Sequence, residues 1–165
     1  MGHSPSLSID SDIQCFYFPW AVVPQGSILG PLLFLIYINN LALEPLKCNL
    51  DMYADDGTLQ SSDVSIKCIE PNLKHDLTIV DKWCTLNNMA INLSKTACMT
   101  IGTQRKLSKL NELSLSVQGI TLQSVETQRL LGIHLDKTLT WNIHIDKLCK
   151  QVNIKINLLK SISQF

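Results

Sequence analysis

Residues 49–59 read Asn49-Leu50-Asp51-Met52-Tyr53-Ala54-Asp55-Asp56-Gly57-Thr58-Leu59 and place two adjacent carboxylates between short apolar runs. An Asp-Gly pair between such runs predicts a tight hairpin, because a primed turn needs positive φ and glycine adopts it freely. Neighbouring side chains of a straight strand point to opposite faces, whereas the chain rotates at a turn. We therefore expect Asp55 and Asp56 to reach one location at a hairpin tip, where they could bind a hard divalent cation. Asp-Asp-Gly also suits a plain solvated turn.

Four motifs follow one another along the chain. Residues 23–34 (Val-Pro-Gln-Gly-Ser-Ile-Leu-Gly-Pro-Leu-Leu-Phe) precede Tyr53-Ala54-Asp55-Asp56, and residues 92–96 (Asn-Leu-Ser-Lys-Thr) and 131–136 (Leu-Gly-Ile-His-Leu-Asp) come after it. In this order and at these separations, the motifs resemble the reverse transcriptase of non-LTR (LINE-type) retrotransposons over residues 22–165. The resemblance implies an RNA-directed DNA polymerase that transfers nucleotides by a two-metal mechanism.

The resemblance also implies a role for particular residues. Asp55 and Asp56 would be the catalytic residues and would bind Mg²⁺ or Mn²⁺. The implied partners are an RNA template, a DNA primer and a deoxynucleoside triphosphate. The residues implied to contact them are Pro24, Gln25, Gly26, Tyr53 and Lys95 for the nucleotide and template, and Leu131 and Gly132 for the primer. Lys95 suits a solvated turn equally well.

One part of the family's catalytic set is missing from this sequence. The family has another aspartate on a strand well upstream of its Pro-Gln-Gly motif, and its fingers subdomain lies earlier still. Asp10 and Asp12 lie too close to Pro24 to occupy that strand, and no apolar strand pattern surrounds them. We therefore expect a polymerase fragment that binds metal weakly and is inactive as this chain. The alternatives are a non-catalytic nucleic-acid-binding remnant and a relic with no selected function.

Apolar spacing predicts the helices and strands. Gly30-Pro31 begins a predicted helix that continues to residue 43 and is apolar on nearly all sides, which indicates burial. A second helix is expected over about 66–86, with Pro71 kinking it or starting its main part. Short strands are expected at 89–93, 96–102 and 129–135, and a hairpin at Gln118-Gly119. A final amphipathic helix is predicted from the apolar positions Trp141, Ile145, Leu148, Val152, Ile156, Leu159 and Ile162.

These elements predict an α+β fold. With the resemblance, we expect a partial polymerase palm, in which helices back an antiparallel sheet with the catalytic-type hairpin, followed by the start of a helical thumb. The expected divisions are an uncertain N-terminal segment at 1–21, the partial palm at 22–127, and the palm–thumb junction with the first thumb helix at 128–165.

Charge is distributed unevenly along the 165 residues, although the net charge is zero. Residues 1–81 contain three Lys/Arg and ten Asp/Glu (net −7), and residues 82–165 contain eleven and four (net +7). This asymmetry favours binding of a polyanion or a metal, or it reflects unrelated solvated faces.

The six cysteines show no zinc-type spacing and predict free thiols in a reducing compartment. No secretion signal opens the chain, and the apolar run at 28–38 is too short to span a membrane. We therefore expect an intracellular protein of the cytoplasm or nucleus with no membrane partner.

Overall fold

The computed structural model describes residues 9–16, 29–63, 65–110 and 113–162, with the backbone alone for 9–16. The Pro24-Gln25-Gly26 motif lies outside the described residues. A five-stranded sheet has the order β2-β3-β1-β4-β7. Its strands are β1 (Ile9–Phe16), β2 (Asn49–Tyr53), β3 (Asp56–Asp63), β4 (Ala97–Ile101) and β7 (Gln123–Ser124). All neighbours pair antiparallel except β4 and β7, which are parallel.

Strand β1 lies at the centre of this sheet, paired with β3 on one side and β4 on the other. The expectation that no strand surrounds Asp10 and Asp12 is therefore wrong. The segment has weak strand propensity, and pairing with two partners distant in sequence overrides that local preference.

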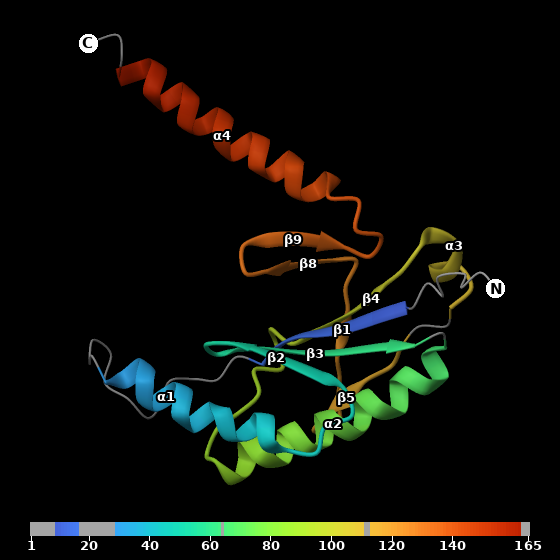
Figure 1. Cartoon of the computed structure of the whole chain (residues 1–165). Helices are drawn as coiled ribbons and strands as arrows, with labels where there is room; N and C mark the ends of the chain where they lie inside the picture. Colours follow the sequence, from blue (N-terminus) through green and yellow to red (C-terminus); the bar gives the residue numbers. More distant parts are fainter. Residues whose placement is uncertain (1–8, 17–28, 64, 111–112, 163–165) are drawn as a thin grey trace, which may run out of the picture.

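Helix α2 (Ile66–Leu86) covers one face of the sheet (Figure 1). Ser65 caps its N-terminus by accepting a hydrogen bond from the backbone amide of Lys67 at 3.3 Å. Pro71 lies inside the continuous helix near its start, where little of the hydrogen-bond ladder precedes it. The predicted apolar stripe is buried and forms much of the core: Ile66, Ile69, Leu73, Leu77, Val80 and Cys84.

Helix α1 (Gly30–Ile38) continues into the 3₁₀ helix η1 (Asn39–Leu43), which matches the predicted extent of the first helix. The expected burial is wrong, because only Gly30, Ile38 and, in η1, Leu41 are buried. Tyr37 packs against Trp83 of α2, with ring centroids 6.1 Å apart. Phe34 is half-buried against the core, whereas four other apolar side chains of α1 are more than half exposed: Leu32 55%, Leu33 54%, Leu35 54% and Ile36 62%.

The second half of the chain adds smaller elements. After α3 (Gln104–Leu107) come two hairpins, β5 (Ser116–Val117) with β6 (Ile120–Thr121) and β8 (Thr127–Leu130) with β9 (Ile133–Asp136). The first is the predicted Gln118-Gly119 hairpin. The second replaces the single strand expected at 129–135, since Leu131 (φ 47°) and Gly132 (φ 89°) form a turn. The strand expected at 89–93 is absent, and these residues form a turn-rich connection.

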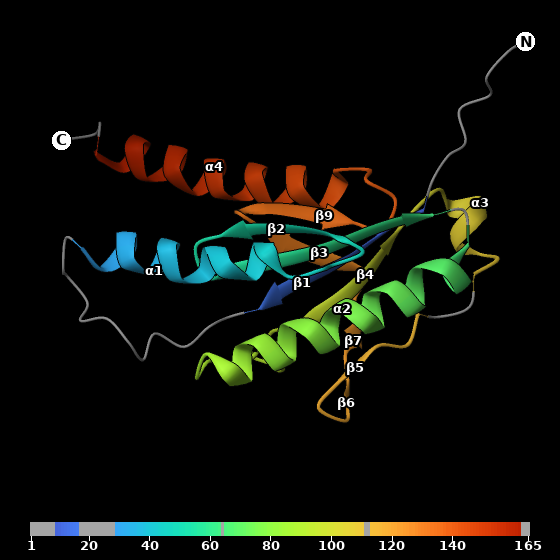
Figure 2. The same ribbon diagram turned by 60° about the horizontal axis from the view of Figure 1, so that its bottom comes forward.

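Helix α4 (Asn142–Ile162) ends the described chain. It lies with β8 and β9 on the opposite side of the main sheet from α1 and α2 (Figures 1 and 2). No residue of α4 is buried, so its predicted apolar stripe contacts solvent over most of its length.

Two further findings concern the chemistry of the chain. All five cysteines in the described side chains are free, and Cys48, Cys84 and Cys98 are buried whereas Cys68 and Cys149 are exposed. Burial raises the pKa of both the Cys48 and the Cys84 thiol to about 12. Among the described residues, none of the helices combines the length and apolarity needed to cross a membrane.

Candidate active site

The β2–β3 hairpin carries the two adjacent aspartates at its tip. Tyr53 and Asp56 are the last paired residues, so Ala54 and Asp55 form the two-residue turn. The turn lies earlier than the Asp56-Gly57 pair predicted, and the positive φ falls on Ala54 (53°) instead of Gly57. Both carboxylates are half-buried, and Tyr53 is 66% exposed. Asp55 and Asp56 therefore stand at one end of the sheet, as the hairpin argument requires.

Strand register brings Lys95 to the same end of the sheet. Thr58 of β3 and Ala97 of β4 both lie opposite Gln14 of β1. Because β3 and β4 are each antiparallel to β1, they run in the same direction. Asp56 and Lys95 precede those two residues by the same number of positions. Two strand spacings, about 10 Å, separate β3 from β4, which is a span that an exposed lysine side chain can partly bridge.

The Leu131-Gly132 turn belongs to a separate two-stranded sheet. Both of its central residues have positive φ, as the type I′ turn requires, and glycine meets that demand without strain. The tips of the β8–β9 and β2–β3 hairpins lie on the same side of the molecule in both views (Figures 1 and 2). The turn thus faces the same end of the molecule as the two aspartates, although from a different sheet.

The register of β1 excludes Asp10 and Asp12 from the hairpin tip. Asp12 lies opposite Gln60 and Asp10 opposite Ser62, further along β3 from Asp56. At about 3.3 Å per residue these positions are roughly 13 and 20 Å from Asp56. Neither aspartate can share a metal ion with Asp56. The β1 residue nearest the tip in this pairing is Phe16, opposite Gly57.

The donor set at the hairpin tip suits a hard divalent cation in part. Two carboxylates offer only oxygen ligands, which Mg²⁺ and Mn²⁺ prefer. In the described part of the chain, His, Cys, Asp and Glu side chains form no group of three or more that could hold a metal ion. Because Mg²⁺ is often bound by one or two carboxylates with substrate phosphates completing its shell, Asp55 and Asp56 fit a weak site.

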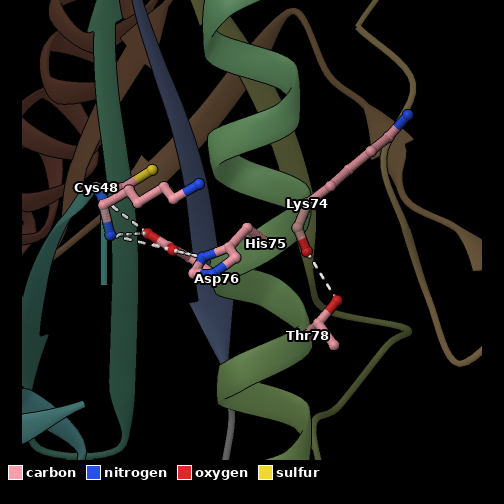
Figure 3. Close-up of polar contacts among 6 residues, drawn as sticks. Cys48, Lys74, His75, Asp76 and Thr78 are labelled. Carbon is pink, nitrogen blue, oxygen red and sulfur yellow. Dashed lines mark hydrogen bonds and ion pairs between the residues drawn. The ribbon is translucent and has the colours of Figure 1, made fainter. Parts of the chain in front are cut away.

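Asp76 anchors the strand that leads into the hairpin, and sequence reasoning missed it. It lies on α2 and is fully buried. Its carboxylate accepts hydrogen bonds from the backbone amides of Lys47 (2.9 Å) and Cys48 (2.7 Å) and from His75 Nδ1 (2.8 Å) (Figure 3). Burial opposes ionisation of Asp76, but these hydrogen bonds outweigh it and lower its pKa. An acid at a buried position of the α2 stripe is the sequence feature that could have revealed it.

Asp136, the last residue of β9, plays a similar part at the start of α4. Its carboxylate accepts from the backbone amides and hydroxyls of Thr138 and Thr140, and from the amide of Trp141 at 3.2 Å. Burial raises the pKa of Asp136, but the hydrogen bonds dominate and lower it to about 2. Asp136 thereby fixes the connection between the β8–β9 hairpin and α4.

Comparison with known proteins identifies the family. A family model described as reverse transcriptase (RNA-dependent DNA polymerase) matches residues 5–135, a span that includes β1, the hairpin tip, Lys95 and the Leu131-Gly132 turn. The chain belongs to this reverse transcriptase family.

The relatives come from mobile elements. The probable RNA-directed DNA polymerase from transposon BS of Drosophila melanogaster is 34% identical over 134 residues, which are 76% of this chain and 14% of that protein. The RNA-directed DNA polymerase from mobile element jockey of the same fly is 27% identical over 143 residues, 82% of this chain and 15% of that protein. The resemblance to the reverse transcriptase domain of a LINE-type retrotransposon is thus confirmed. No solved structure matches the chain.

Proposed function

We propose that this chain supplies the metal- and nucleotide-binding part of an RNA-directed DNA polymerase. In this proposal the five-stranded sheet with α1 and α2 is part of a polymerase palm, and α4 begins the thumb. The observation that supports it best is the Tyr53-Ala54-Asp55-Asp56 motif at a hairpin tip, with Lys95 at the same end of the sheet.

Asp55 and Asp56 would hold Mg²⁺ or Mn²⁺. When bound, such ions stabilise charge on the attacking and leaving oxygens of a phosphoryl transfer. Lys95 would contribute a positive charge toward the triphosphate of the incoming nucleotide. Tyr53, exposed beside the turn, would contact the nucleotide or the template, as would Pro24, Gln25 and Gly26. The Leu131-Gly132 turn would approach the DNA primer, where the absence of a glycine side chain allows close backbone contact.

The activity of this chain by itself is a separate question. Among the described residues, His, Cys, Asp and Glu side chains form no group of three or more that could hold a metal ion, and the register keeps Asp10 and Asp12 away from the tip. Removing one positioned electrostatic group commonly costs about a hundredfold or more in rate. We infer that the isolated chain does not extend a primer, and that polymerase activity needs a further carboxylate from elsewhere in a longer protein.

Primer extension on an RNA template with Mg²⁺ or Mn²⁺ tests that inference. We expect no incorporation by the isolated chain. Incorporation that disappears in Asp55→Ala but persists in Asp51→Ala would contradict it, because Asp51 is an exposed residue of the same hairpin, away from the tip.

Metal binding tests the site directly. Paramagnetic Mn²⁺ should broaden the backbone resonances around Asp55 and Asp56 in the full chain at low millimolar concentration. The broadening should be lost in Asp55→Asn/Asp56→Asn and retained in Asp51→Asn. Equal broadening in both variants would mean that Asp55 and Asp56 do not form the metal-binding site.

A second candidate function is non-catalytic binding of nucleic acid. It is favoured by the exposed lysines of α4: Lys147, Lys150, Lys155 and Lys160. Exposed lysines that neutralise phosphates give binding without sequence preference. This function would survive loss of both hairpin carboxylates.

A further inference from the structure

A group of four basic side chains lies where the β8–β9 hairpin meets the first turns of α4. This basic cluster comprises Arg129 of β8, His134 of β9, and His144 and Lys147 of α4. Lys147 Nζ lies 3.2 Å from His134 Nδ1, and the backbone amide of His134 donates to His144 Nδ1 at 3.4 Å. Arg129 is the cross-strand partner of His134, a position at which side chains lie about 5 Å apart at Cβ.

Acidic residues near the basic cluster are engaged elsewhere or lie on another face. Asp136 accepts hydrogen bonds from Thr138, Thr140 and Trp141, and Glu126 pairs with Lys137 at 2.7 Å. Asp146 is next to Lys147 on α4, but adjacent helix positions do not face each other. No ion pair found in the described part of the chain joins a carboxylate to the cluster.

The cluster therefore places like charges against one another. Loss of solvent lowers the pKa of His134, and the charges of Lys147, Arg129 and His144 lower it further. The Lys147 ammonium can donate to His134 Nδ1 only while that nitrogen is unprotonated. Within the described ranges, no carboxylate pairs with these basic groups. An anion that accepts hydrogen bonds from several of them would therefore stabilise the cluster.

We propose that the basic cluster of Arg129, His134, His144 and Lys147 is a binding site for a phosphate group. A phosphate offers several acceptor oxygens, which can receive hydrogen bonds from the guanidinium, the ammonium and a protonated imidazole together. The phosphate can belong to a nucleic-acid backbone or be free in solution. The site does not involve Asp55 or Asp56, and it rests on the second candidate function, because Lys147 is among the lysines that would bind nucleic acid there.

Phosphate binding should be linked to protonation of His134. In the free protein, loss of solvent and then the neighbouring cations lower the pKa of His134 and favour the neutral ring, whereas a bound anion favours the imidazolium and raises its pKa. Binding then takes up a proton, so affinity should increase as pH falls through the interval between the free and bound pKa values. Arg129 and Lys147 stay charged over this range and supply the part of the affinity that does not depend on pH.

The experiment follows the His134 and His144 ring resonances of the full chain by NMR during titration with inorganic phosphate and, separately, with a single-stranded oligo(dT). We expect phosphate to move both rings and raise the pKa of His134. Lys147→Gln should weaken binding roughly threefold to tenfold. Lys67→Gln, at an exposed lysine of α2 on the opposite side of the main sheet, should leave it unchanged.

The two titrations distinguish the sources of the phosphate. A larger response to oligo(dT) than to phosphate at equal phosphate concentration identifies a backbone contact, and Lys147→Gln should then reduce the log–log salt slope by about 0.7. Unmoved ring resonances in both titrations, or equal losses in Lys147→Gln and Lys67→Gln, would overturn the proposal. Asp55→Asn/Asp56→Asn should bind phosphate with unchanged affinity. A failure of the hairpin tip to bind metal would therefore not be confused with a failure of the phosphate site.

Discussion

The carboxylate of Asp76 lies 2.7 Å from the backbone amide of Cys48, the residue immediately before β2 begins. This hydrogen bond joins the middle of α2 to the base of the strand that leads into the Asp55-Asp56 turn. The neighbouring amide of Lys47 donates to the same carboxylate. A helix that carries none of the expected catalytic residues therefore sets where the hairpin starts.

Replacing Asp76 should destabilise the fold. Asp76→Ala leaves the buried amide of Cys48 without its acceptor, and we expect a loss of about 2–4 kcal/mol in the free energy of unfolding. Urea denaturation followed by circular dichroism measures it. Asp51→Asn, an exposed acid on β2, should change stability by no more than about 0.5 kcal/mol. Equal midpoints for Asp76→Ala and the wild type would mean that this anchor is not needed.

Stability should depend on pH through Asp136. Its pKa is lowered from 3.8 to about 2 in the folded chain, so the folded state favours the charged carboxylate. The stabilisation is complete above pH 3.8 and is lost as pH falls toward 2. It amounts to about 2 kcal/mol for a shift of this size.

The measurement compares the wild type with Asp136→Asn by urea denaturation between pH 2 and pH 6. Other acids titrate in both proteins, so the difference between their unfolding free energies isolates Asp136. That difference should be largest above pH 4 and shrink toward pH 2. A difference that is constant across the range would refute the assignment.

The positive φ of Ala54 predicts an unusual response to glycine. A non-glycine residue in the left-handed region costs about 1–2 kcal/mol, and glycine removes that cost while increasing the flexibility of the unfolded chain. Ala54→Gly should therefore stabilise the fold by up to about 1 kcal/mol, and the β-branched Ala54→Val should destabilise it. Thermal unfolding of both variants checks the two signs.

Ala90 provides the matched control for this turn. It is also exposed and outside helices and strands, and it is not among the residues with positive φ. Ala90→Gly should be neutral or destabilising. The turn assignment fails if glycine has the same effect at positions 54 and 90.

Binding to an RNA–DNA hybrid should be weak and should decrease with salt. The motivation is the net charge of +7 over residues 82–165, including Arg105, Lys106, Lys109, Lys147 and Lys150. Few phosphate contacts give a shallow log–log slope, about −0.9 for each phosphate neutralised on a duplex. Fluorescence titration of a labelled hybrid at several salt concentrations measures the slope.

Magnesium should add to this affinity beyond its effect on ionic strength, because it would cover the carboxylates of Asp55 and Asp56. The gain should shrink in Asp55→Asn/Asp56→Asn. No binding at low salt, or binding unaffected by salt, would count against both the nucleic-acid role and the charge argument.

Local sequence patterns correctly predicted those helices and turns that are determined by the spacing of their own side chains. The stripe from Ile66 to Cys84 predicted α2 because helical spacing and burial coincide there. The Leu131-Gly132 turn was missed as a turn because only its glycine marked it, while Leu131 also adopts positive φ. The burial of α1 was overestimated, because apolar composition shows what a helix can bury and does not show whether a partner is present.

At the candidate site, the sequence placed Asp55 and Asp56 at a hairpin tip but could not place Lys95 at the same end of the sheet. That relationship depends on Gln14 pairing with both Thr58 and Ala97. The side-chain pattern of one strand shows which residues share a face, but it does not show which distant strand will pair with it. Asp76 and Asp136 were missed for a related reason, since many of their partners are backbone amides, which any residue could supply.

The central position of β1 bears on how this domain can be shortened. A version beginning at residue 22 would keep all four motifs that identify the family. It would also remove the strand that pairs with both β3 and β4. Two inner strands would then become unprotected edges, which invite pairing with other chains. We therefore expect a fragment that begins at residue 22 to keep the family's motifs but to aggregate more readily than the full chain.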